Sequence, residues 1–147
     1  MSGSFAHTMS GFSGSLETCL RALEESSVYQ EMPPALRFVA ELILDEMASN
    51  TIKYGGADCH EIVVRIDFDG ESMRVEMSDD ALPFDPWTAA PIHDDPVPAA
   101  IEDLAIGGRG LRMLAEATDS QHYERKGGRN INIMIRNVHR PGRSAAA

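Results

Sequence analysis

The chain is 147 residues long, with 43% hydrophobic residues and a net charge of −10 at neutral pH, which is typical of one globular domain. The acidic balance argues against direct nucleic-acid binding, because phosphate contacts require clustered Lys and Arg. No apolar run reaches the roughly 18 residues of a membrane-spanning helix, and the first residues do not have the pattern of a secretory signal. Cys19 and Cys59 belong to no metal-binding cluster, so we expect a protein of the reducing cytoplasm.

The first part of the chain predicts a flexible segment followed by a helix. Residues 1–14 are rich in Ser and Gly and are expected to be flexible, although Phe5 and Phe12 are compatible with a short edge strand. Residues 15–27 repeat apolar side chains at helical spacing, with Ser15 as a candidate N-cap.

A second, longer helix is predicted for residues 34–54, with a proline in its first turn and Gly55 just past its end. Apolar residues occupy one face of its first half, and three polar side chains lie on that same face in its second half. These are Glu46, Asn50 and Lys53. Arg37 and Glu41 lie on the opposite side, which we expect to face solvent. Burying polar groups is costly unless they are paired or bind something, so the polar face is either a helix end emerging into solvent or part of a binding site.

The second half of the chain predicts four strands. Residues 61–68 and 72–78 alternate in hydrophobicity on either side of an Asp-Gly pair and predict a β-hairpin. Two further strands are predicted at about 120–125 and 129–137, and residues 138–147 are expected to form a flexible tail.

Residues 79–108 lie between the two pairs of strands, are rich in Pro, Asp and Ala, and lead into a short predicted helix. A loop of this length inside a compact domain is more often a lid or a binding loop than a plain connection. Residues 15–137 therefore read as one domain in which strands and helices occur in separate runs. This favours an α+β two-layer sandwich, with helices covering one face of a mixed, mostly antiparallel sheet.

Three polar signals follow one another along the chain: the polar face of the long helix, Asp79 directly after a strand, and the Gly-rich turn at 107–110 before a helix. Each suits a nucleotide. Such a turn offers free N–H groups and a favourable dipole to phosphates, and Asp79 can accept a hydrogen bond from the amine of adenine. Asn50 suits Mg²⁺, which takes few protein ligands, and Glu46, one turn earlier, can orient or deprotonate a hydroxyl or a water. Taken singly, each signal is also explained by an ordinary turn or a solvated side chain.

Together and in this order, the motifs resemble those of the GHKL ATPases, the superfamily of DNA gyrase B, Hsp90, MutL and the catalytic domain of histidine kinases. The resemblance covers residues 15–137 and implies the Bergerat fold of that superfamily. Within it, the chain is most similar to the short anti-sigma-factor serine kinases. The box around Asp79 reads Ser-Asp-Asp-Ala-Leu-Pro-Phe-Asp-Pro, and Gly-Gly-Arg-Gly-Leu follows a Pro-rich lid.

The resemblance also implies roles for individual residues. Glu46 matches the catalytic glutamate, Asn50 the Mg²⁺-binding asparagine, and Asp79 the aspartate that reads the adenine amine. Lys53 falls where a basic residue approaches the phosphates, and Asn130 lies in a region that supports the adenine pocket. The other positions that we assign to the nucleotide site are Ala81, Phe84, Gly108, Arg109, Gly110 and Leu111.

The chain departs from the superfamily pattern Asp-x-Gly-x-Gly after Asp79, because Ala81 and Pro83 replace the two glycines. Ala81 adds a methyl group close to the expected position of the base, and Pro83 removes an N–H donor and stiffens the loop. We interpret both replacements as a feature of the short-kinase branch.

The resemblance thus implies an ATP- and Mg²⁺-dependent anti-sigma regulator with serine/threonine protein kinase activity toward an anti-anti-sigma partner of the STAS type. A sigma factor is the second expected partner, and the family resemblance is compatible with a homodimer formed through residues 1–30. Two alternatives remain open. One is a nucleotide-dependent module that sequesters a partner without phosphorylating it, and the other is a detached histidine-kinase-type ATPase domain.

Overall fold

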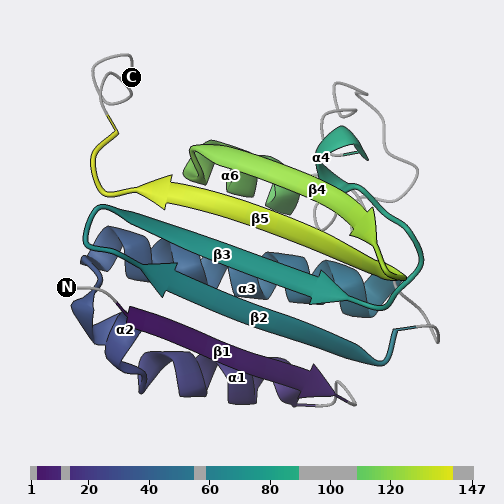
Figure 1. Cartoon of the computed structure of the whole chain (residues 1–147), viewed down its shortest axis with the longest axis horizontal. Coiled ribbons are helices and arrows are strands. Elements are labelled where there is room, and N and C mark those ends of the chain that lie inside the picture. The colour runs from purple at the N-terminus through teal and green to yellow at the C-terminus, as the bar shows by residue number, and fades with distance from the viewer. Residues whose placement is uncertain (1–2, 11–13, 55–58, 90–108, 141–147) are drawn as a thin grey trace.

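The computed structural model describes residues 3–10, 14–54, 59–89 and 109–140 (Figure 1). The elements in these ranges are, in chain order, β1 (Gly3–Ser10), α1 (Ser15–Glu24), α2 (Ser27–Glu31), α3 (Pro34–Tyr54), β2 (Glu61–Phe68), β3 (Ser72–Asp79), α4 (Pro86–Ala89), α6 (Arg109–Ala117), β4 (Ser120–Lys126) and β5 (Arg129–Asn137). None of the helices in the described ranges is long and apolar enough to cross a membrane.

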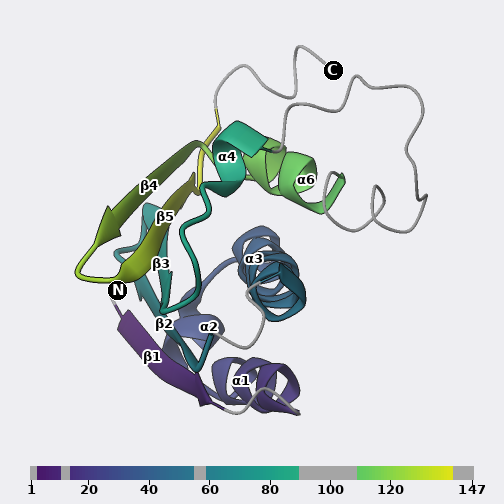
Figure 2. The same cartoon turned by 90° about the vertical axis from the view of Figure 1, so that its right-hand side faces the viewer.

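The five strands form one antiparallel sheet in the order β1-β2-β3-β5-β4. The turn between β4 and β5 depends on glycine, because Gly127 and Gly128 have φ angles of 61° and 76°, in the left-handed region. Helices α1, α3 and α6 all lie on the same face of the sheet (Figure 2). The predicted α+β two-layer sandwich is therefore confirmed.

The hydrophobic core lies between the sheet and α3. Every second residue of β2 and β3 is buried, and the first half of α3 adds five buried apolar side chains: Leu36, Val39, Ala40, Ile43 and Leu44. Toward one end of the sheet, the inward-facing positions become polar. Asp79 on β3 and Asn130 on β5 lie directly opposite each other, and Asn132 follows two residues along β5. All three are buried, so this end of the core is where a polar ligand would find partners.

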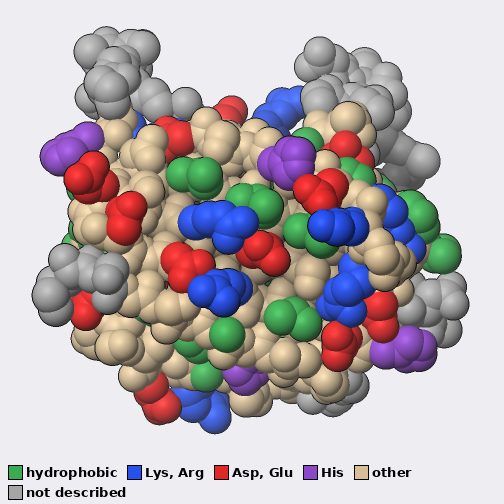
Figure 3. Space-filling view, in the orientation of Figure 1, with side chains coloured by type: hydrophobic (Ala, Val, Ile, Leu, Met, Phe, Trp, Pro, Cys, Tyr) green, Lys and Arg blue, Asp and Glu red, His purple; other side chains and the backbone are tan. Residues whose placement is uncertain are grey.

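The opposite face of the sheet is covered by mixed charges and scattered apolar side chains (Figure 3). Two ion pairs lie along neighbouring strands, Arg65–Asp67 at 3.0 Å and Arg74–Glu76 at 3.1 Å. Exposed pairs of this kind contribute little to stability, and they keep an open sheet face hydrated.

The helix predicted for residues 15–27 ends earlier, at Glu24, and a second short helix, α2, begins at Ser27. The Ser26 hydroxyl accepts a hydrogen bond from the N–H of Tyr29 at 3.2 Å and caps the start of α2. A five-residue helix is too short for its periodicity to be recognised in the sequence.

The expectation that Arg37 and Glu41 face solvent is wrong, because both are half-buried against α2. Arg37 donates from Nε to the carbonyl of Tyr29 and from Nη2 to that of Gln30, each at 2.9 Å. The Tyr29 hydroxyl donates to Glu41, and this bond to a carboxylate raises the pKa of Tyr29 to about 12. These contacts fasten α2 to the first half of α3.

Both ends of the described chain pack onto the domain. β1 is the edge strand that Phe5 suggested, with its Phe5 side chain in the core, whereas Phe12 lies outside the described residues. Arg140 pairs with Asp119 at 2.8 Å, and residues 141–147 lie outside the described part of the chain. Of the predicted lid, residues 79–108, the structure describes only the part that ends with α4. Residues 90–108 lie outside the described part of the chain.

Candidate functional site

One polar side chain in the second half of α3 is buried in the core rather than exposed to solvent. Asn50 is only 6% exposed, and neither its Oδ1 nor its Nδ2 has a hydrogen-bond partner among the described residues. An unpaired buried amide costs about 1–3 kcal/mol of stability. Its retention is explained if the amide has a ligand.

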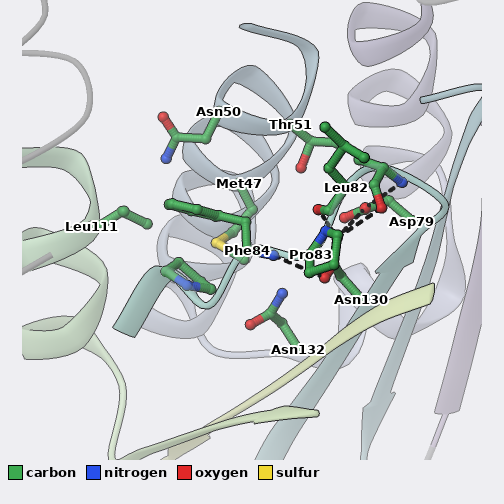
Figure 4. A pocket seen from close by; sticks show the side chains of 12 residues that line it. Met47, Asn50, Thr51, Asp79, Leu82, Pro83, Phe84, Leu111, Asn130 and Asn132 are labelled. Atoms are coloured by element: carbon green, nitrogen blue, oxygen red, sulfur yellow. Dashed lines mark hydrogen bonds between the residues drawn. The ribbon is translucent and has the colours of Figure 1, made fainter. Parts of the chain in front are cut away.

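Asn50 lines a pocket of about 240 Å³ between α3, the end of β3, β5 and the start of α6 (Figure 4). Its apolar lining consists of Met47, Ala81, Leu82, Pro83, Phe84, Pro86 and Leu111. Its polar lining comes from both the helix and the sheet and consists of Asn50, Thr51, Asp79, Asn130 and Asn132. Pockets for drug-sized ligands usually enclose about 300–1,000 Å³. This one is therefore sized for a flat ring such as a nucleobase, with the rest of a nucleotide extending outward.

Asp79 is held in the pocket wall by two hydrogen bonds to the same oxygen. Its Oδ1 accepts from the N–H of Ala81 at 3.0 Å and from Nδ2 of Asn130 at 2.9 Å. Neither bond uses Oδ2, so that oxygen remains an acceptor for a donor on a ligand.

Asn130 organises the loop that follows Asp79. Besides Asp79, its Nδ2 donates to the carbonyls of Ala81 at 3.4 Å and Leu82 at 2.9 Å. Its Oδ1 accepts from the N–H of Phe84 at 3.2 Å and from the Tyr123 hydroxyl at 2.6 Å. Both ends of the amide are thus engaged within the protein. Its part in the site is to fix the aspartate and the loop.

The neighbouring Asp80 points away from the pocket. Its Oδ1 accepts from the N–H groups of His60 at 2.8 Å and Glu61 at 3.1 Å, which fixes the start of β2. Burial favours a higher pKa for Asp80, but the amide donors outweigh burial and lower it below the ordinary aspartate value. The two adjacent aspartates therefore have different roles, one at the ligand pocket and one in the framework.

Glu46 lies one turn before Asn50 and faces the start of α6. A Cβ atom added to Gly110 would be 1.8 Å from Oε1 of Glu46, so the carboxylate fills the space that a side chain would need. Burial, together with the nearby charge of Asp45, raises the pKa of Glu46 above its ordinary value. A carboxyl group with a raised pKa is suited to accept a proton.

The structure brings together most of the predicted site residues. Those that line the pocket are Asn50, Asp79, Ala81, Phe84, Leu111 and Asn130. Glu46 and Gly110 contact each other, whereas Lys53 is exposed at the last turn of α3, away from the pocket wall. Arg109 begins α6, but its side chain and all of Gly108 lie outside the described residues.

Three further side chains of this region that carry polar groups are not identified from the sequence. Thr51 and Asn132 line the pocket, and Trp87 donates from Nε1 to Oδ1 of Asn132 at 3.0 Å. A signal for Asn132 was present, because it lies two residues after Asn130 and so on the same face of a strand. Trp87 belongs to a four-residue helix that no periodicity predicts.

A comparison with protein families supports the interpretation of this pocket as a nucleotide site. Residues 13–136 match the model of the histidine kinase-like ATPase domain. The chain belongs to this family. No curated protein matches the chain. The histidine kinase-like ATPase domains are part of the GHKL superfamily, so the superfamily expected from the motifs is confirmed and the chain is an ATP-binding domain.

The residues present fit ATP with Mg²⁺. Asp79, on β3, offers a free acceptor for the amine of a nucleobase. Asn50, which lines the same pocket from α3, offers an unpaired buried amide oxygen. In the described ranges, no group of three His, Cys, Asp or Glu side chains gathers that could hold a metal. Asn50 would therefore hold Mg²⁺ jointly with phosphate oxygens and water, as is usual for this ion.

Proposed function

We propose that this histidine kinase-like ATPase domain is an anti-sigma regulator that phosphorylates serine or threonine on a protein partner. The observation that carries the proposal is the position of Glu46, which lies one turn before Asn50, the expected Mg²⁺ ligand, and against Gly110 in the first turn of α6. A base at this place can reach a hydroxyl group that approaches the phosphates from outside the pocket.

Each of three side chains has a separate task in this proposal. Asp79 orients the adenine ring, Asn50 holds Mg²⁺, and Glu46 takes the proton of the attacking hydroxyl. ATP supplies the transferred phosphoryl group. Catalysis then depends mainly on positioning, because phosphoryl transfer requires little covalent chemistry from the protein.

The proposed substrate is a serine of an anti-anti-sigma protein of the STAS type, and the proposed second partner is a sigma factor. The proposal rests on the resemblance of residues 78–86 to the corresponding box of the short anti-sigma kinases. In the structure, most of this segment forms the pocket wall between Asp79 and Pro86.

Transfer of label from γ-labelled ATP to a purified STAS partner tests the activity. We expect acid-stable label on a serine with the wild-type protein, and loss of transfer with Glu46→Ala. Glu71→Ala, which removes an exposed carboxylate just before β3 and outside the pocket lining, is the matched control and should retain activity. Acid-labile label would instead indicate a phosphohistidine and the detached histidine-kinase alternative.

A second candidate function is sequestration of a partner without phosphorylation. Ala81 and Pro83 favour it, since they replace glycines in a loop that Asn130 and Arg125 fix. Arg125 donates from Nη1 to the carbonyl of Ala81 at 2.8 Å. Nucleotide-dependent partner binding with no transfer of label, in wild type and Glu46→Ala alike, would favour this candidate over the kinase.

We also propose that the protein forms a homodimer through β1. Within the described sheet, β1 pairs only with β2, and its eight residues include no Asp, Glu, Lys or Arg. The other edge strand, β4, carries Glu, Arg and Lys, which protect an edge from pairing. Light scattering should report a dimer for the wild type and a monomer for Thr8→Lys. A wild-type monomer at micromolar concentration would exclude the dimer.

A further inference from the structure

Asn132 lies in the wall of the pocket without a role in the scheme above. It is 4% exposed and faces the core from β5, opposite Met77 on β3 and Tyr123 on β4. Its neighbour on the same face is Asn130, two residues earlier, which lies opposite Asp79.

The orientation of the Asn132 amide is set by Trp87. An indole Nε1–H can only donate a hydrogen bond, so the atom that it contacts at 3.0 Å must be Oδ1. The amide nitrogen Nδ2 is therefore turned the other way. Figure 4 shows the Asn132 side chain reaching into the pocket beside Asn130.

Nδ2 of Asn132 makes no hydrogen bond within the described part of the chain. This distinguishes it from Nδ2 of Asn130, which has three acceptors within 3.4 Å. A buried amide that keeps one end bound and presents its other end to a pocket is a fixed donor for a ligand.

Asp79 and Asn132 present complementary groups from neighbouring strands. Asp79 offers an acceptor at Oδ2 and Asn132 a donor at Nδ2, and they occupy diagonal positions on β3 and β5. Diagonal neighbours of this kind are about 7–8 Å apart, which leaves room for the edge of a purine between their side chains. The amine of adenine donates, and the ring nitrogens beside it accept.

We propose that Asn132 is a specificity-determining residue that donates a hydrogen bond from Nδ2 to a ring nitrogen of the adenine base. This inference rests on the proposed binding of ATP. Trp87 contributes as a positioning residue, since its hydrogen bond holds the Asn132 amide with Nδ2 toward the pocket.

Calorimetric titration with ADP·Mg²⁺ and its 1-deaza and 7-deaza analogues tests the proposal. Each analogue replaces one ring nitrogen beside the amine by a C–H group. We expect one of the two to bind the wild-type protein about 3- to 10-fold more weakly than ADP, the usual effect of one neutral hydrogen bond. Equal binding of both analogues and ADP, within about twofold, would overturn the proposal.

Asn132→Asp provides the second test, because it keeps an oxygen acceptor for Trp87 and replaces the donor by an acceptor. We expect this variant to bind ADP at least about 10-fold more weakly than the wild type does. The deaza analogue that binds the wild type more weakly than ADP should bind the variant no more weakly than ADP. Asn137→Asp adds the same charge at an exposed position of β5 and should change the affinity by less than about twofold.

These experiments distinguish failure of the proposed ATP-dependent function from failure of the proposed role of Asn132. If the wild-type protein binds no adenine nucleotide, both the proposed function and this inference fail. If it binds ADP and neither Asn132→Asp nor the deaza analogues weaken binding, only the role of Asn132 is refuted.

Discussion

Gly110 and Glu46 are in such close contact that a methyl group on Gly110 would lie 1.8 Å from Oε1 of the glutamate. The contact joins the helix that carries the proposed base to the helix whose N-terminus should meet the phosphates. Since the atom in the way is the far end of a flexible side chain, a larger residue at 110 would displace the carboxylate rather than the backbone. Glycine is thus needed at position 110 because it leaves room for the Glu46 carboxylate.

Gly110→Ala should therefore damage activity more than stability. We expect a loss of about 1 kcal/mol or less in the free energy of unfolding, and a fall of phosphotransfer of about 10²-fold or more, because the proposed base is misplaced. Chemical denaturation and the labelled-ATP assay measure the two effects.

The same contact predicts coupling between the two residues. In a Glu46→Ala background, Gly110→Ala should cost almost nothing in stability and remove no further activity. Additive effects of the two substitutions would show that the clash with Glu46 is not what makes the glycine necessary.

Glu46→Gln should stabilise the protein at neutral and alkaline pH while lowering phosphotransfer by about 10²- to 10⁴-fold. The pKa of Glu46 is raised in the folded state, so its ionisation weakens folding as pH rises through that value. The variant lacks this ionisation. Its melting temperature should exceed that of the wild type at pH 8, and the difference should disappear below about pH 4. A lower melting temperature of Glu46→Gln at pH 8 would contradict the raised pKa of Glu46 and its proposed role as proton acceptor.

Asn50→Leu should separate stability from function in a similar way. Removing an unpaired buried amide should leave the free protein as stable as before or about 1 kcal/mol more stable. Nucleotide affinity should fall and should no longer respond to Mg²⁺, which titrations with and without EDTA would detect. Unchanged Mg²⁺ dependence would remove Asn50 from the metal site.

Asn130→Ala should destabilise the protein by about 3 kcal/mol, because five hydrogen-bond partners on β3, β4 and the following loop lose their common contact. Asn137→Ala, on the same strand but exposed, is the matched control and should stay within about 0.5 kcal/mol of the wild type. Urea denaturation of both variants measures the difference.

The long helix shows why part of the site could be predicted. Its observed bounds, Pro34–Tyr54, are those predicted, because the proline start and the helical periodicity are local signals. Asn50, on a face that begins as apolar, was already anomalous in the sequence, and the structure buries it without a partner among the described residues.

The parts that the sequence did not predict depend on pairing between distant segments. Asn132 is an ordinary strand residue until β5 pairs with β3 and α4 brings Trp87 against it. Arg37 also appeared solvent-exposed on its own helix, and it is half-buried because α2 returns to accept its hydrogen bonds.

The most direct test of the ATP site is calorimetric titration of ADP·Mg²⁺ and IDP·Mg²⁺ into the wild type and Asp79→Asn. The substituted amide can keep its oxygen toward Ala81 and Asn130, which places a donor where Oδ2 meets the base. We predict that the wild type prefers ADP and that Asp79→Asn loses at least about 10-fold in ADP affinity. Its preference should shift toward IDP, whose base carries an acceptor in place of the amine. Absence of ADP binding to the wild type, or equal ADP affinity of both proteins, would contradict the account.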